Sequence, residues 1–303
     1  MSYFDLQVNG YGGVDFNQDD LTADGLHTAC EALERDGVGG ILATIITEKI
    51  DDMARRLSNL AELRGRDALA QRVIPGFHIE GPFLNETPGY RGAHPEDAIH
   101  PADLDEMKVL LDAAQGLTRL VTLAPERDAS FGVTRFLSGQ GVAVSAGHCD
   151  PTLDELRGAI DAGLTLFTHL GNGCPMQMHR HDNIVQRALS LHDQLRLCFI
   201  ADGAHIAFPA LGNYLRLAGL ERAVVVTDAI APAGLGPGTY TIGRWTLLIG
   251  DDMVARSPDG SHLVGAAISM PETVRNLVGQ VGLSEANALQ LTCDNPKAAL
   301  GLN

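Results

Sequence analysis

The chain has 303 residues, of which 45% are hydrophobic and 20% are charged. This balance supplies a full core for one large α/β domain and excludes an intrinsically disordered protein. The formal net charge is -16, and no cluster of Lys and Arg stands out, so nucleic acid is excluded as a partner class.

The five cysteines are scattered, odd in number and free of any Cys-x-x-Cys pair. They indicate reduced thiols rather than a disulfide scaffold, and therefore a cytoplasmic protein. The start of the chain, residues 1–5, lacks a basic segment followed by an apolar one, so we expect no signal peptide. No uncharged apolar run is long enough to span a bilayer, which excludes a membrane protein.

Short apolar runs alternate with amphipathic stretches along most of the chain. The apolar runs predict strands at 4–9, 41–47, 73–80, 118–124, 142–147, 164–169, 195–201 and 223–228. The amphipathic stretches predict helices at 21–35, 51–63, 104–114, 130–138, 152–162, 184–191 and 209–218. Eight strands that alternate with helices fit a closed barrel better than an open sheet, so we predict a (β/α)8 TIM barrel.

Two long loops and one insertion interrupt this rhythm. Residues 81–101 and 171–183 are rich in Gly, Pro, His and Asn, and loops of that length in a compact domain are usually functional. Residues of about 230–265 carry many glycines and two short strand-like runs, which predict a small β insertion. Helices at 270–280 and 284–293 then close the chain. We therefore expect residues 1–303 to form a single barrel domain.

Acidic or imidazole side chains close four of the predicted strands. Glu80 follows the third strand, His148 the fifth, His169 the sixth and Asp228 the eighth, and His205 comes shortly after the seventh. Barrel enzymes carry their chemistry at the carboxyl ends of the strands. One Glu and two His suit a divalent metal with a position open for water, and Asp228 is placed to move a proton.

Each of these residues also has a purely structural interpretation. A single His at a strand end is more often hydrogen-bonded structure than a ligand, and an Asp after a Val run is often a helix N-cap. His78 shares a strand face with Glu80, where a packed inner histidine is as good an interpretation as a site residue. Glu126, at another strand end, fits a support for the site or a helix cap equally well. The four residues together favour a metal site, because neutral residues would do as well if packing were the only requirement.

Longer segments carry a resemblance to a known family. They include Asp-Leu-Gln-Val-Asn-Gly at 5–10, His-Ile-Glu-Gly-Pro-Phe-Leu-Asn at 78–85 and Ser-Ala-Gly-His at 145–148. Further segments follow in the same order as in the family, at 92–94, 121–126, 168–170, 201–205, 226–234 and 274–278. The chain resembles the N-acetylglucosamine-6-phosphate deacetylase family of the amidohydrolase superfamily over nearly its whole length.

This resemblance implies a set of roles. Glu80, His148 and His169 would be metal ligands, Asp228 the catalytic acid and base, and His94 a second catalytic group that polarises the amide carbonyl. In the first strand, Gln7 and Asn9 stand where many amidohydrolases have a His-x-His pair, which resembles the single-metal variant. We expect one zinc ion, with iron(II) as the alternative. The implied substrate contacts are Ala93, His94, Asn172, Gly173, Arg180, Asp202, Gly203, Ala204, His205, Leu263, Val264 and Gly265.

The predicted function is hydrolysis of the acetamide of an N-acetyl amino sugar, with N-acetylglucosamine 6-phosphate giving glucosamine 6-phosphate and acetate. The expected partners are an amino sugar or its phosphate and a second copy in a homodimer, since the resemblance implies substrate-binding groups that reach across a dimer interface. The chain differs from the family's pattern in three places: we expect the β-sandwich segments to be absent, His181-Asp182-Asn183 follow Arg180, and Gly171 follows the His-Leu pair. Two alternatives follow, an amidohydrolase for non-phosphorylated or cyclic amides and a non-catalytic sugar-binding barrel.

Overall fold

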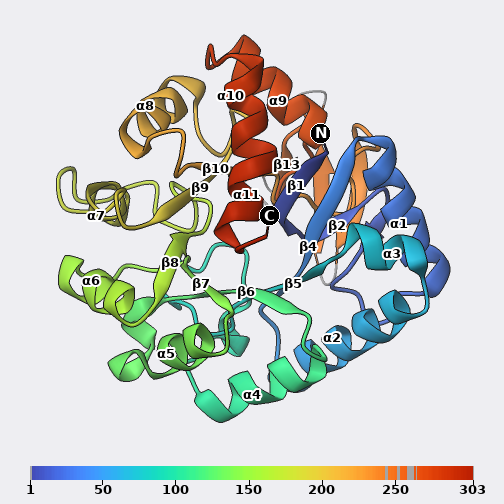
Figure 1. The fold of residues 1–303 in the computed structure, drawn as a ribbon, viewed down its shortest axis with the longest axis horizontal. Helices are drawn as coiled ribbons and strands as arrows, with labels where there is room; N and C mark the ends of the chain where they lie inside the picture. The colour runs from blue at the N-terminus through green and yellow to red at the C-terminus, as the bar shows by residue number, and fades with distance from the viewer. Residues whose placement is uncertain (1, 243–244, 251–252, 258–262, 264, 303) are drawn as a thin grey trace.

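The computed structural model describes residues 2–242, 245–250, 253–257, 263 and 265–302. Eight parallel strands lie in one sheet in the order β1-β4-β5-β6-β7-β8-β9-β10, nearly closed into a barrel with helices around it (Figure 1). The strands are β1 (Tyr3–Val8), β4 (Val38–Ile46), β5 (Gly76–Glu80), β6 (Thr118–Leu123), β7 (Ala143–Ala146), β8 (Leu164–Phe167), β9 (Arg196–Ile200) and β10 (Val224–Val226). The predicted (β/α)8 TIM barrel is confirmed.

The surrounding helices pack apolar faces on the strands. They are α1 (Ala23–Arg35), α2 (Ile50–Gly65), α3 (Ala68–Val73), α4 (Leu104–Ala113), α5 (Gly132–Gly139), α6 (Leu153–Asp161), α7 (Ile184–Ser190) and α8 (Phe208–Ala218). Helix α6 begins with a capping box formed by Thr152 and Glu155. Within the described residues, no helix combines the length and the apolarity needed to cross a membrane.

One predicted boundary places residues in the wrong type of element. The third strand was expected from residue 73, but Val73 is the last residue of α3 and β5 begins at Gly76. Asp67 starts α3 by accepting hydrogen bonds from the Leu69 and Ala70 amides, a local signal that outweighs the β-branched Val73. Pro75 then holds the chain extended, so the strand begins after it.

Smaller elements lie outside the barrel strands. A short hairpin, β2 (Gly10–Tyr11) with β3 (Val14–Asp15), follows β1 and was not predicted. After β10, the strands β11 (Gly238–Ile242), β12 (Trp245–Ile249) and β13 (Ala255–Arg256) form an antiparallel sheet. The helices α9 (Met270–Gly279), α10 (Glu285–Leu289) and α11 (Asn295–Ala299) follow, with a π-helical turn at Gln290–Asp294. Short 3-10 turns lie at Glu96–Ala98, Pro125–Arg127 and Ala129–Phe131.

The barrel interior is layered, and the layers place the site. At the end where the strands begin, an apolar cluster packs against Ala299, Leu300 and Leu302, and α11 crosses the centre of the ring in Figure 1. That cluster consists of Phe4, Leu6, Leu42, Leu120, Leu166, Cys198, Ile200, Val224, Val226, Ala266 and Ile268. With one end of the barrel filled by side chains, polar chemistry is confined to the other.

A buried polar layer separates this apolar cluster from the strand ends. His78 Nε2 lies 2.8 Å from Thr122 Oγ1, which lies 2.7 Å from Thr168 Oγ1. Thr168 Oγ1 in turn lies 2.6 Å from Ser145 Oγ, and Thr44 Oγ1 is 3.4 Å from His78 Nδ1. Burial lowers the pKa of His78 to about 4, so the ring is neutral. The structure thus makes His78 a packed, hydrogen-bonded inner histidine, one of the two interpretations left open by the sequence.

The seam of the barrel lies between β1 and β10 and is closed by one buried carboxylate. Val8 pairs with Ala229, and the Asn9 amide donates to the Ala229 carbonyl at 2.7 Å. Nearer the start of β1, the Asp5 carboxylate accepts from the Thr227 hydroxyl at 2.5 Å and from the Thr227 amide at 3.2 Å. Asp5 therefore joins β1 to Thr227 with side-chain hydrogen bonds, at a seam where the backbone pairing is short.

Stability should respond to the ionisation of Asp5. Burial raises the pKa of this carboxyl to about 7, against the opposing bonds from Thr227 and Gln7. A folded pKa above the unfolded one of about 3.9 stabilises the fold most at low pH, and this contribution is lost as the pH rises through about 7. We expect the melting temperature of the wild type to fall relative to Asp5→Asn between about pH 4 and pH 7. A constant difference across this window would show that Asp5 does not titrate there.

Candidate metal centre and active site

Three buried side chains converge at the carboxyl ends of β5, β7 and β8. Glu80 is the last residue of β5, and His148 and His169 each stand two residues beyond their strands. One ligand atom from each of the three lies within 4.8 Å of the others. Glu80 Oε1 is 3.0 Å from His169 Nε2 and 3.3 Å from His148 Nε2. The group predicted from separate strand ends is thus a single cluster that can hold a metal ion.

The backbone of this cluster is strained at the residues whose side chains matter. His148 has φ of 51°, His169 of 30° and Asp228 of 53°, all in the left-handed region that non-glycine residues avoid. Each such residue costs on the order of 1–3 kcal/mol. Glycine would relieve the strain at every one of these turns. Backbone strain of this kind clusters at functional sites, which fits a site at this end of the barrel.

The hydrogen bonds of the His148 ring show whether its Nε2 atom can bind a cation. His148 Nδ1 lies 2.8 Å from the Tyr90 carbonyl oxygen, and because a carbonyl only accepts, Nδ1 carries the ring proton. In the neutral ring Nε2 then offers a lone pair, and it faces the Glu80 carboxylate at 3.3 Å. A ring nitrogen and a carboxylate oxygen at this distance need a proton or a metal cation between them. A divalent cation, with its preference for imidazole and carboxylate donors, fits this arrangement.

The charges in the cluster favour an ionised Glu80. Burial alone would raise the pKa of Glu80, but the hydrogen bonds to His148 and His169 hold it well below its usual range. Conversely, the pKa of His169 is raised: burial opposes this, and the bond to Glu80 outweighs it. An ionised carboxylate and two imidazoles together form a donor set that suits a divalent cation, which would take the place of the shared proton.

Two side-chain amides, one in β1 and one just after it, hold the two carboxylates of the site. Gln7 Nε2 donates to Glu80 Oε2 at 3.1 Å, which leaves Oε1 for the imidazoles. Asn9 Nδ2 donates to Asp228 Oδ1 at 2.7 Å. Burial, followed by the charge of Glu80, raises the pKa of Asp228 above that of an ordinary aspartate. Asp228 is consequently a stronger base than a solvated carboxylate and can both take and return a proton.

His94 stands beside the cluster on the long loop 81–101. Its Nε2 lies 3.2 Å from His148 Nε2, and its Nδ1 lies 2.8 Å from Thr47 Oγ1. Burial, followed by the charge of His148, lowers the pKa of His94 to about 3, so the ring is neutral. Thr47 was not singled out from the sequence, although it closes the predicted strand 41–47 just as Glu80 closes the next one. Its position at a strand end is the signal that was available.

Other predicted contacts lie around the same end of the barrel. Asp202 caps the turn after β9 by accepting from the Ala204 and His205 amides at 2.9 and 2.8 Å. Its second oxygen lies 2.6 Å from His205 Nδ1, which presents the ring as half of an Asp–His pair. His205 is close enough to Asp228 for its charge to lower the pKa of that carboxyl, against the larger effect of burial. Asn172 donates to the His169 carbonyl, so the start of loop 171–183 is tied to the site.

The remaining predictions are less closely connected to the cluster. Arg180 is exposed on loop 171–183, and no contact of its side chain to the Glu80 cluster occurs within the described part of the chain. Leu263 bridges to Arg256, and Gly265 packs against Ile230 and the Asp228 carbonyl. Val264 lies outside the described residues. The sequence thus identified the centre of the site better than its periphery.

Gly173, one of the predicted substrate contacts, lies directly against the His148 ring, so a substitution there tests the geometry of the site. A Cβ at this position would lie 2.8 Å from His148 Nδ1, and its φ is +60°. Gly173→Ala should therefore displace the imidazole and weaken metal binding by about tenfold or more, as loss of an outer-shell support does. Gly141→Ala is the matched control, because Gly141 has φ of +75° and a Cβ added there would meet no atom within 4 Å. Equal metal affinity in the two variants would refute the predicted clash with His148.

Comparisons with known proteins add the family. No family model matches the chain. It is 32% identical to the N-acetylgalactosamine-6-phosphate deacetylase of Escherichia coli O157:H7 over 303 residues, which cover 100% of this chain and 78% of the relative. It is also 32% identical to the human N-acetylglucosamine-6-phosphate deacetylase over 309 residues, covering 99% and 74%.

Solved structures agree with the sequence relatives. An aspartate-to-alanine variant of the N-acetyl-D-glucosamine-6-phosphate deacetylase from Mycobacterium smegmatis, in complex with N-acetyl-D-glucosamine-6-phosphate, superimposes with a TM-score of 0.89 at 32% identity. The match covers 99% of this chain and 77% of that chain. The Thermotoga maritima N-acetylglucosamine-6-phosphate deacetylase gives 0.85 at 26% identity, with 99% and 78% covered. On these grounds the chain belongs to the N-acetylglucosamine-6-phosphate deacetylase family.

Proposed function

We propose that this protein hydrolyses the acetamide of an N-acetylhexosamine 6-phosphate, with N-acetylglucosamine 6-phosphate giving glucosamine 6-phosphate and acetate. One observation carries the proposal: Glu80, His148 and His169 converge on one point at the end of the barrel that also holds the half-buried Asp228. The relatives named above act on phosphorylated acetamido sugars, which supports this substrate class over a cyclic amide or a non-catalytic barrel.

In this proposal Glu80, His148 and His169 hold one divalent metal, zinc in the first instance and iron(II) as the alternative. When bound, such an ion supplies Lewis-acid chemistry that polarises a carbonyl and makes a water more acidic. Gln7 fixes the Glu80 carboxylate for this purpose, since its amide occupies the other oxygen. An amide is a weaker metal ligand than an imidazole, and Gln7 and Asn9 stand where the resemblance would place a His-x-His pair, so we propose a single ion.

Asp228 moves the proton. As a carboxylate it takes a proton from the attacking water while the water oxygen bonds to the amide carbon. It then delivers that proton to the nitrogen as the carbon–nitrogen bond breaks, which releases the amine and the acetyl group as acetate. The raised pKa of Asp228 suits both steps, because the group is basic enough to accept and acidic enough to return the proton.

His94 stabilises the oxygen of the carbonyl. The neutral ring can donate from Nε2 when Thr47 donates to Nδ1, and the Thr47 and Nδ1 atoms are 2.8 Å apart. In the structure the Nε2 atoms of His94 and His148 lie 3.2 Å apart. If His148 Nε2 held a metal ion, the Nε2–H of His94 would be free to donate to the carbonyl oxygen, on which negative charge develops.

The sugar and its phosphate would be held by the surrounding loops. We assign Ala93, Asn172, Gly173, the turn Asp202 to His205, Leu263, Val264 and Gly265 to the sugar. His205 and Arg180 are proposed for the phosphate, because a guanidinium grips phosphate oxygens in pairs. Arg180 is exposed on its own chain, which agrees with a homodimer in which it reaches the neighbouring site.

Acetate release is the test. Zinc-loaded protein should release acetate from N-acetylglucosamine 6-phosphate and from its galactosamine epimer in a measurable ratio, and much more slowly from unphosphorylated N-acetylglucosamine. Equal rates with and without the phosphate would refute the phosphorylated substrate. Absence of turnover on all three sugars by folded, metal-loaded protein would refute deacetylation itself.

A further inference from the structure

The carboxylate of Glu126 lies beside the loop that carries His148, outside the cluster of the three expected metal ligands. Glu126 stands in the 3-10 turn Pro125–Arg127, which follows β6. Its Oε1 atom accepts from the Asp150 amide at 2.6 Å and from Asn85 Nδ2 at 2.8 Å. Its Oε2 atom is buried and has no hydrogen-bond partner in the described part of the chain. Both of these hydrogen bonds therefore depend on one oxygen atom.

The partners of Glu126 decide between the two interpretations that the sequence left open, a support for the site and a helix cap. Asp150 lies two residues before Thr152, the N-cap of α6, so its amide is not part of that helix. Asn85 lies on the long loop 81–101. Glu126 is thus a support, which ties the end of β6 to the loops that follow β5 and β7.

The two bonds act on the backbone of His148, whose φ of 51° lies in the left-handed region. The Asn85 amide donates to the His148 carbonyl at 3.0 Å, which fixes the peptide group directly after His148. Glu126 Oε1 holds the next peptide group through the Asp150 amide, and it holds Asn85 through its side chain. A strained residue persists only where its surroundings over-determine it. Here one carboxylate oxygen helps to hold two consecutive peptide groups.

The backbone of His148 determines where its ring points, and the ring has little room. A Cβ added at Gly92 would lie 2.9 Å from His148 Cε1, and one added at Gly173 would lie 2.8 Å from Nδ1. Between these two glycines, Nδ1 donates to the Tyr90 carbonyl and Nε2 faces Glu80 Oε1 at 3.3 Å. A shift of the peptide groups after His148 would therefore turn Nε2 away from Glu80 or press the ring against the glycine backbones.

From these contacts we propose that Glu126 is a positioning residue for His148. It acts through its hydrogen bonds to the Asp150 amide and the Asn85 side chain, which hold the left-handed backbone and keep Nε2 directed at Glu80. The inference rests on the proposed function in one respect, since it takes His148 Nε2 to be a metal ligand. Outer partners that orient a metal-binding imidazole typically contribute a factor of about 10 to 100 in metal affinity or activity.

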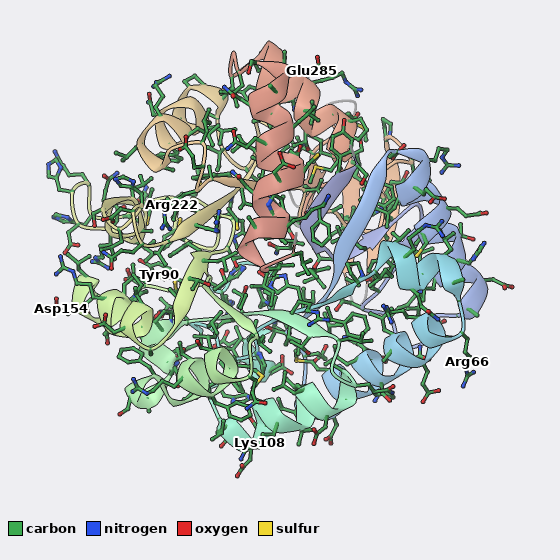
Figure 2. The ribbon with its side chains drawn as sticks, in the orientation of Figure 1. Arg66, Tyr90, Lys108, Asp154, Arg222 and Glu285 are labelled. Carbon is green, nitrogen blue, oxygen red and sulfur yellow. The ribbon has the colours of Figure 1, made fainter. Side chains whose placement is uncertain are left out.

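The test uses three variants and a matched control. Glu126→Met removes the acceptor but keeps a side chain of similar length. Glu126→Gln is the conservative variant, because its amide oxygen can still accept both bonds. Asn85→Ala removes the side chain that links Glu126 to the Asn85 backbone. The control is Glu285→Met, the same substitution at an exposed residue in the first turn of α10, which Figure 2 shows at the outer edge of the molecule.

The readouts are zinc affinity without substrate, by competition with a chelator, and the visible spectrum of the cobalt-substituted protein. We expect zinc affinity about 10- to 100-fold lower in Glu126→Met, and close to that of the wild type in Glu126→Gln and Glu285→Met. Asn85→Ala should lose part of the affinity. The double variant Asn85→Ala/Glu126→Met should lose less than the sum of the two single losses, because the two side chains share a hydrogen bond.

The cobalt spectrum separates positioning from a general loss of stability. Glu126→Met should shift the spectrum, because the ring of one ligand moves, and Glu126→Gln should restore it. A variant that only melted at a lower temperature would keep the wild-type spectrum at temperatures well below its melting point.

Two results would overturn the proposal. One is wild-type zinc affinity with an unshifted cobalt spectrum in Glu126→Met. The other is a loss in Glu126→Gln as large as that in Glu126→Met, since the charge and not the pair of hydrogen bonds would then matter. If Glu126→Met does not fold, unchanged zinc affinity in Asn85→Ala overturns the proposal. Failure of the proposed function is a separate result, since the wild type itself would then bind no zinc or release no acetate.

Discussion

Replacing Asp228 with asparagine is expected to lower kcat by about 10³-fold, within the range of about 10² to 10⁴ that general acid–base groups contribute. The amide keeps the shape of the side chain and still accepts the bond from Asn9, but it cannot take a proton from water. Zinc affinity should be unchanged, because Asp228 is not among the three ligands proposed here. Acetate release and zinc content measured on one preparation check both parts, and a variant that retains turnover would remove Asp228 from the mechanism.

The same substitution should stabilise the fold. The pKa of Asp228 is raised in the folded state, mainly by burial and then by Glu80. A group of this kind stabilises the protein fully below its unfolded pKa and loses that contribution as the pH rises through the folded pKa. In chelator-treated protein, Asp228→Asn should therefore melt higher than the wild type at neutral pH, and the difference should shrink toward about pH 4, near the unfolded pKa of an aspartate. A lower melting temperature for the variant at neutral pH would contradict the sign of this shift.

The second large effect is expected for Glu80→Gln, which should abolish metal binding. Glu80 Oε1 is the atom that both His148 Nε2 and His169 Nε2 face, and a neutral amide of the same shape is a much poorer ligand. We expect metal content after dialysis to fall from one ion per chain to none, and acetate release to fall to background. Glu155→Gln, in the exposed capping box of α6, is the matched control and should keep its metal. Metal retained by Glu80→Gln would show that the ligand set is different.

The sequence predicted the barrel and the centre of the site because both follow from local patterns. Glu80 ends a run of apolar residues, and the ends of parallel strands must share one rim, so Glu80, His148, His169 and Asp228 were expected near each other. The structure places the first three in one cluster and makes Asp228 sensitive to the charge of Glu80. Strand periodicity therefore carried most of the positional information.

What the sequence did not reveal depends on contacts between distant segments. The Tyr90 carbonyl that sets the His148 tautomer is a backbone atom, which has no signature in the residue type. The left-handed turns at His148 and Asp228 defy local preference, because glycine would be the local choice. Likewise, nothing in the pattern distinguishes the braced Arg187 from the exposed Arg180, since pairing with Asp150 and Asp182 arises only once three loops meet.

The most direct test of the metal centre is to add zinc back to chelator-treated protein while acetate release from N-acetylglucosamine 6-phosphate is recorded. We predict that the treated protein is inactive and that activity rises in proportion to zinc up to one equivalent per chain, then stays constant. Full activity in the metal-free protein, or no recovery at any zinc concentration, would contradict the claim that Glu80, His148 and His169 hold the ion beside Asp228.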